Sequence, residues 1–178
     1  MISEKMNAAL NAQVTKEMYS AYLYMAMSSY SNSIGLKGFA KWFMVQYHEE
    51  MFHAMKMYEY IHSQGGAVIL KAIDEPPAAF EGPLDMFTKT LAHEQMVTRS
   101  INDLMEIAIG EKDHATQIFL HWYVTEQIEE EENDNDIIQQ LKLIQDHPQG
   151  LLMLDRDLAQ RTATVPLDFS QGVSGGGA

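Results

Sequence analysis

Glu50 and His53 form a Glu-x-x-His pattern in the middle of a long stretch with helical periodicity. At helical spacing the same face carries Phe43 before this pair and Met57 after it, so a carboxylate and an imidazole interrupt a stripe that should face a core. Burial of an unpaired carboxylate costs several kcal/mol, which predicts a compensating cation or proton. Glu and His one helical turn apart can reach the same metal ion. Alone, the pattern is weak evidence for a metal site.

Three other apolar stripes carry a polar group near their middle. They are interrupted by Glu17, by Glu94, and by Gln127 with Glu130. Like Glu50, these groups lie roughly ten to seventeen residues from the expected start of a helix, so at about 1.5 Å per residue all should lie at mid-height of a bundle. Carboxylates that face one another in a dry core repel unless cations neutralise them. One such Glu is usually a hydrogen-bonded or partly exposed side chain, but four of them on four helices predict a metal site.

The donor set indicates which metal could bind and how many ions. Carboxylate oxygens with one imidazole suit iron or manganese, with zinc as a competitor that cannot change its redox state. Glu50 can bridge two ions, one held with Glu17 and His53 and the other with Glu94 and Glu130. The sequence therefore predicts a dinuclear site built from four helices.

A third cation could bind beside this pair. Glu126, Glu129 and Glu130 lie on the side of their helical stretch that adjoins the site, and Glu49 immediately precedes Glu50. The alternative for the acidic run that contains them is a solvated helix face.

Tyr24 lies two helical turns beyond Glu17 on the same face. Its phenol could therefore supply an electron or a hydrogen bond to the metals. A core tyrosine without that role is nearly as well supported. The histidines other than His53 are expected at the surface or at helix ends.

These residues are positioned by an all-α arrangement. Helical periodicity predicts four long helices and a short fifth one, with Ser3 and Asp113 as N-caps. The predicted ranges are about 4–32, 37–64, 83–110, 114 to the break at His147-Pro148, and from there to about 161.

The connections set the topology. A short turn at Gly35 makes the first two helices antiparallel neighbours, whereas the connection over 67–82, interrupted by Pro76-Pro77, is long enough to cross the bundle. The second and third helices should therefore run parallel. We expect one domain over 1–162 and a flexible tail over 163–178.

Composition excludes several functional classes. The chain has 178 residues, 46% of them hydrophobic, which suits one domain with a core. Its formal charge of −13 argues against nucleic acid or an anionic membrane as a partner, and the absence of cysteine excludes disulfides and thiolate metal sites. The sequence shows neither an apolar run of about 18 to 20 residues nor a basic region followed by a hydrophobic block at its start, so a cytoplasmic location is expected.

The chain resembles the ferritin family, and specifically the haem-free bacterial ferritins, over about 2–161. Four segments carry the resemblance: Glu17-Met18-Tyr19-Ser20, His48 to His53, His93-Glu94-Gln95, and Trp122 to Glu131. The resemblance implies a ferritin-like four-helix bundle with a long crossover between the second and third helices. It also implies three iron positions, held by Glu17, Glu50 and His53; by Glu50, Glu94 and Glu130; and by Glu49, Glu126, Glu129 and Glu130.

Two departures separate the chain from haem-binding and cysteine-containing relatives. Gln127 and the residues after it replace the second Glu-x-x-His that bacterioferritins carry on their fourth helix, so Gln127 is assigned to the site. Met51 matches the haem-ligating methionine of bacterioferritins, but haem-free relatives keep a methionine there too, so no haem is expected. Rubrerythrins share the bundle but need cysteine pairs, which this chain lacks.

The resemblance implies iron storage with ferroxidase activity. Fe(II) would be oxidised by O2 or H2O2 at the di-iron site, with Glu50, His53 and Tyr24 as catalytic residues, and stored as a ferric mineral inside a 24-subunit shell of identical chains. Two alternatives stay open. One is a soluble di-iron oxidase or oxygenase that forms no shell and acts on an organic substrate, and the other is a bundle that binds metal only structurally.

Overall fold

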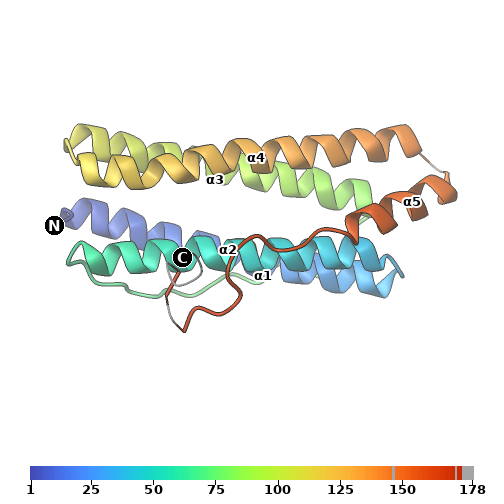
Figure 1. The fold of residues 1–178 in the computed structure, drawn as a ribbon, viewed down its shortest axis with the longest axis horizontal. Helices are drawn as coiled ribbons and strands as arrows, with labels where there is room; N and C mark the ends of the chain where they lie inside the picture. The colour runs from blue at the N-terminus through green and yellow to red at the C-terminus, as the bar shows by residue number, and fades with distance from the viewer. Residues whose placement is uncertain (146, 171, 174–178) are drawn as a thin grey trace.

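The fold was taken from a computed structural model, which describes residues 1–145, 147–170 and 172–173. The described residues form helices without strands, as predicted, and Figure 1 shows four long helices side by side with a short one across one end. The helices are α1 (Glu4–Ser33), α2 (Lys37–Ser63), α3 (Pro83–Gly110), α4 (His114–Ile144) and α5 (Pro148–Leu158).

The connections follow the predicted topology. A short turn joins α1 to α2 and another joins α3 to α4, so each pair is antiparallel. The connection between α2 and α3 runs the length of the bundle, and α2 and α3 are therefore parallel (Figure 1).

Helix ends are fixed partly by local caps and partly by distant ones. The Ser3 and Asp113 side chains accept hydrogen bonds from the backbone N–H groups of Met6 and Thr116, so both predicted N-caps are confirmed. The start of α2 has no local side-chain cap; instead Asp155 on α5 accepts from the N–H of Gly38 at 2.8 Å. Glycine is required at 38, because an added Cβ would lie 1.5 Å from the Asp155 backbone oxygen.

The fifth helix is shorter than predicted. It ends at Leu158, whereas the sequence suggested an end near Arg161. The N–H of Gln160 donates to the carbonyl of Asp157, and that of Arg161 to Leu158, so the last turn tightens into bonds three residues apart and the α-helix stops. Beyond it, the described part of the 163–178 tail runs back along α2 without regular structure (Figure 1), while 171 and 174–178 lie outside the described residues.

The core consists of two apolar clusters separated along the bundle axis. One contains Met27, Phe39, Phe43, Met86, Phe87 and Ile138, and the other contains Leu10, Val14, Met57, Ile61, Ile101 and Leu120. Each long helix contributes one end to the first cluster and its other end to the second. The polar residues predicted for the metal site lie between these two ends on every long helix. The two clusters hold the helices together, at about 1.5 to 3 kcal/mol for each large side chain buried, and so place the polar groups at one level.

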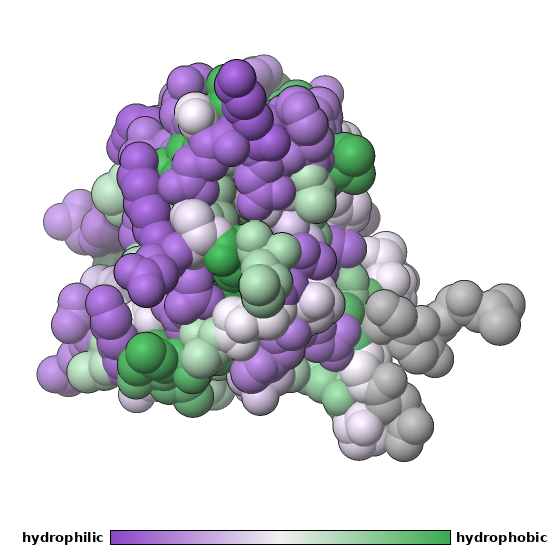
Figure 2. All heavy atoms as spheres, turned by 90° about the vertical axis from the view of Figure 1, so that its left-hand side faces the viewer, coloured by the Kyte–Doolittle hydropathy of each residue, from purple (hydrophilic) through white to green (hydrophobic). Residues whose placement is uncertain are grey.

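Figure 2 shows the end at which α1 begins, and this face is mainly hydrophilic with small, separate hydrophobic areas. Within the described residues, no helix combines the length and the apolar content that crossing a membrane would require.

Candidate metal centre

The polar groups predicted from four apolar stripes form one buried layer. All are between 1% and 5% exposed, namely Glu17, Glu50, His53, Glu94, Gln127 and Glu130. Each of the four long helices contributes to this layer, because helical periodicity turns the polar positions toward the same interior as their apolar neighbours. The sequence therefore predicted which residues the bundle would bury together.

The three predicted ligands of the first ion are assembled closely. Ligand atoms of Glu17, Glu50 and His53 all lie within 4.8 Å of one another, and His53 Nδ1 is 3.5 Å from Glu50 Oε2. Glu17 Oε2 and His53 Nε2 are buried without a hydrogen-bond partner among the described residues. Buried polar atoms are normally paired, so unpaired atoms on two members of this group are consistent with a metal site among the three side chains.

The other half of the layer is held by hydrogen bonds. The Tyr24 hydroxyl donates to Glu94 Oε1, and Gln127 Nε2 donates to Glu94 Oε2 at 3.1 Å. Gln46 Nε2 donates to Glu130 Oε2 at 2.9 Å. Glu94 and Glu130 thus lie in the layer as predicted, but among the described residues they belong to no group of three ligands as tight as the first. The hydrogen bond of Tyr24 goes to the Glu94 carboxylate, and its roles toward the metals stay a prediction.

Burial and mutual repulsion perturb the ionisation of the layer. Burial and then the nearby Glu94 and Glu17 carboxylates raise the pKa of Glu50 well above its ordinary value. Burial and then Glu130 raise the pKa of Glu94 to about 8. Burial lowers the pKa of His53, which keeps its imidazole neutral and its nitrogen lone pair available. Without cations the layer therefore holds protons, and divalent cations would release them.

The residues predicted for a third cation line one pocket of about 520 Å³ beside the layer. Glu49, Glu126, Glu129 and Glu130 all contribute to it. Glu49 is buried, Glu126 is half-buried and Glu129 is exposed. Their ligand atoms do not form a tight group within the part of the chain that the structure describes. Instead, Arg161 Nη2 donates to Glu49 Oε2 at 2.6 Å.

Sequence reasoning missed several residues that support the layer. Gln13 Nε2 donates to Glu17 Oε1 at 2.8 Å, which leaves the other oxygen of Glu17 free, and the Tyr123 hydroxyl donates to the His53 carbonyl at 2.8 Å. Asp134 is 1% exposed, and neither of its carboxylate oxygens has a partner in the described structure. Each left a signal in the sequence, because each lies one helical turn from a predicted site residue: Gln13 from Glu17, Tyr123 from Gln127, and Asp134 from Glu130.

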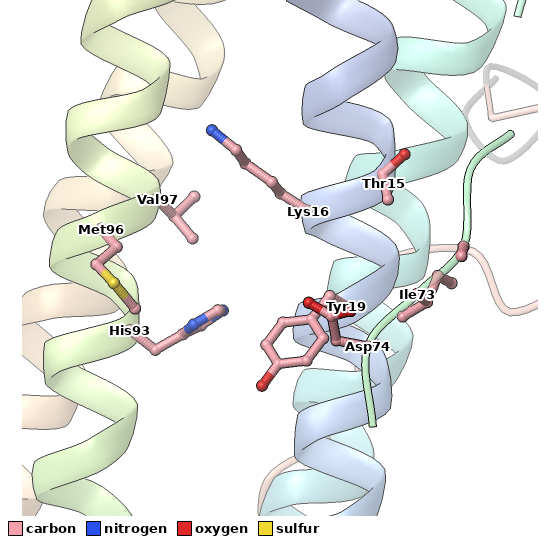
Figure 3. Close-up of a pocket in the computed structure, with 9 residues that line it drawn as sticks. Thr15, Lys16, Tyr19, Ile73, Asp74, His93, Met96 and Val97 are labelled. Atoms are coloured by element: carbon pink, nitrogen blue, oxygen red, sulfur yellow. The ribbon is translucent and has the colours of Figure 1, made fainter. Parts of the chain in front are cut away.

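His93 is a correction to the expectation that it would be exposed or at a helix end. It is buried, and its Nε2 lies 2.8 Å from Ser20 Oγ. Figure 3 shows His93 on α3 facing α1, at a pocket of about 410 Å³ into which Lys16 extends from α1. The adjacent Glu94 points into the metal layer, because consecutive residues of a helix project about 100° apart around its axis.

Comparisons with known proteins agree with this geometry. A family model described as "Ferritin-like domain" matches residues 7–144. Two curated relatives are named bacterial non-heme ferritin. The one from Bacteroides fragilis is 41% identical, and the match covers 90% of this chain and all of the relative. The one from Campylobacter jejuni is 40% identical, and the match covers 88% of this chain and 93% of the relative. A solved open pore ferritin from Archaeoglobus fulgidus superposes with a TM-score of 0.90 at 50% identity, covering 91% of this chain and all of the other. An engineered closed form of that ferritin superposes with a TM-score of 0.91 at 50% identity. This match covers 92% of this chain and all of the engineered chain.

Proposed function

This chain belongs to the ferritin family, and from that premise we propose that it oxidises Fe(II) to Fe(III) in the buried layer and stores the product as a ferric mineral. The observation that carries the proposal is the convergence of Glu17, Glu50 and His53, with a free oxygen on Glu17 and a free nitrogen on His53. Iron is the substrate in this reaction. Carboxylate oxygens with one imidazole bind iron in both oxidation states, and binding to carboxylates favours the more highly charged ion.

The proposed reaction is a two-electron transfer. Two Fe(II) ions lose one electron each, and O2 takes up both electrons with two protons to form H2O2; when H2O2 is the oxidant, two electrons and two protons convert it to two water molecules. Glu50 would bridge the two ions, with Glu17 and His53 on one side and Glu94 and Glu130 on the other. Two adjacent ions suit this reaction because each supplies one of the electrons.

The supporting residues have separable tasks in this proposal. Burial and the Glu94 carboxylate raise the pKa of Tyr24 well above its ordinary value, so the phenol keeps its proton and can hold Glu94 in place. Gln127 holds the second oxygen of the same carboxylate. Tyr24 and Gln127 thus act on the second ion through Glu94, with electron supply by the phenol as a further role of Tyr24.

Storage requires an enclosed volume that a single bundle does not provide. We therefore propose a homo-oligomeric shell of 24 subunits in the cytoplasm, in which the excess of acidic groups attracts iron to the inner surface. Gel filtration tests the shell directly. A species near monomer or dimer mass would contradict it and leave a soluble di-iron oxidase as the function.

Oxidation is tested by mixing metal-free protein with Fe(II) under anaerobic conditions and then admitting air. We expect rapid formation of Fe(III), which is measured by its absorbance. That rapid phase should be lost in Glu50→Ala and His53→Ala. Gln127→Ala should weaken oxidation less than Glu50→Ala does, because Gln127 acts through Glu94. The matched control is Glu132→Ala, which removes an exposed carboxylate from α4. Oxidation at the uncatalysed rate in the unmodified protein would make the site structural.

A further inference from the structure

We propose that Arg161 is a tethered cation that takes the place of a third metal ion, so that metal binds at Glu49 only when the guanidinium leaves. The inference rests on the proposed function, because the competing cation is iron. The guanidinium donates from Nη2 to Glu49 Oε2 at 2.6 Å and lies over the Trp42 ring, with its central carbon 4.4 Å from the ring centre. Both partners are largely buried, at 21% exposed for Arg161 and 9% for Glu49.

The charge distribution of the pocket explains why a cation is held there. Six carboxylates line it, and Arg161 is the only cationic side chain among the described residues of its lining. The carboxylates belong to Glu49, Glu126, Glu129, Glu130, Asp136 and Asp157. Such a cluster repels itself unless a cation enters. The guanidinium therefore performs in the metal-free chain the neutralisation that a metal ion would otherwise provide.

The position of Arg161 is set by the fold and not by a neighbour in sequence. It follows α5, which is fastened to the start of α2 by the hydrogen bonds from Gly38 and Phe39 to Asp155. Further along, the N–H of Val173 donates to Glu59 Oε1 on α2 at 2.8 Å. The segment that carries Arg161 is thus held against α2 on both sides, which keeps the guanidinium close to Glu49.

The guanidinium can nevertheless be displaced. Its second nitrogen, Nη1, is buried without a hydrogen-bond partner within the described chain, so the group is held by one ion pair and one aromatic contact. Bidentate pairs, in which both nitrogens bind the carboxylate, are the stronger arrangement. A divalent ion carries twice the charge and can bind several of the carboxylates together. The third position should therefore fill at higher Fe(II) concentration than the first two.

The test is an anaerobic calorimetric titration of the metal-free full chain with Fe(II). The unmodified protein should bind two ions tightly and a third one weakly. In Arg161→Gln the third ion should bind about tenfold more tightly, since a competing unit charge is lost from a largely buried pair. Arg161→Lys keeps the charge and should keep the third ion weak. Arg156→Gln removes the same charge from an exposed position on α5 and is the matched control.

A second measurement reports the displacement itself. The chain has two tryptophans, so in a Trp122→Phe background Trp42 is the only source of tryptophan emission. Zn(II), which has no redox chemistry, should change Trp42 emission as the third ion binds, and Arg161→Gln should abolish that change.

Four outcomes would overturn the proposal: a third-ion affinity unchanged in Arg161→Gln, an equal gain in Arg156→Gln, no third ion in either protein, or loss of the two tight ions in Arg161→Gln. Failure of the proposed function is distinguishable, because it appears as absent Fe(II) oxidation in the unmodified protein.

Discussion

Asp134→Asn should stabilise the metal-free protein, and the effect should depend on pH. Asp134 is 1% exposed and unpaired within the described structure. Burial and then the Glu94 and Glu130 carboxylates raise its pKa from 3.8 to about 9. Asparagine has nearly the same size and the same unpaired polarity, but it does not ionise. The substitution therefore removes the ionisation penalty and little else.

The magnitude follows from the difference between the folded and unfolded pKa values. Below about pH 4 the Asp134 carboxyl is protonated in both states and the penalty is absent. As pH rises, the unfolded chain releases the proton while the folded chain retains it, and folding loses about 1.4 kcal/mol per pH unit. Between the ordinary pKa of 3.8 and pH 7 the loss reaches about 4 kcal/mol. For a chain of this length the variant should melt roughly 10 °C higher at pH 7.

Scanning calorimetry of metal-free protein at pH 4 and pH 7 provides the assay. Asp136→Asn, at an exposed position two residues away, is the control and should leave the melting temperature unchanged. An equal gain at both pH values would show that packing, not ionisation, is responsible. No gain at pH 7 would show that Asp134 does not cause the predicted ionisation penalty. Loss of Fe(II) oxidation in Asp134→Asn would instead make this residue part of the metal site.

Three further predictions concern stability and support of the layer. Gly38→Ala should lower the free energy of unfolding by about 1 to 3 kcal/mol, because the new Cβ displaces the Asp155 backbone and with it α5. Limited proteolysis should then cut the exposed end of α4. Tyr123→Phe should lower stability by about 1 kcal/mol in urea titrations, since it removes the hydrogen bond to the His53 carbonyl; a loss of oxidation as large as that of a ligand variant would contradict a purely structural role. In Asp134→Asn, which lacks the Asp134 titration, the metal-free protein should still be more stable at pH 5 than at pH 8, because the pKa of Glu94 is raised to about 8 and stability is lost as pH rises toward that value. Zn(II) should reduce this difference in thermal melts of the variant, and a difference that Zn(II) leaves unchanged would place the titrating group elsewhere.

The sequence by itself determined the helices and the residues that share a level. Helical periodicity is local information, so the interrupted stripes identified Glu17, Glu50, His53, Glu94 and Glu130 before any fold was known. Counting the rise per residue then placed them at one height. The structure confirms the bundle, its crossover and the burial of these groups.

Only the tertiary structure decided which side chains meet across the bundle. Arg161 and Glu49 are 112 positions apart, and Arg161 lies in an irregular segment where no period predicts direction. Asp155 caps α2 from another helix, and Gln13 selects which oxygen of Glu17 stays free. Such contacts depend on how helices cross and on which rotamers fit, and spacing along one helix carries no information about either.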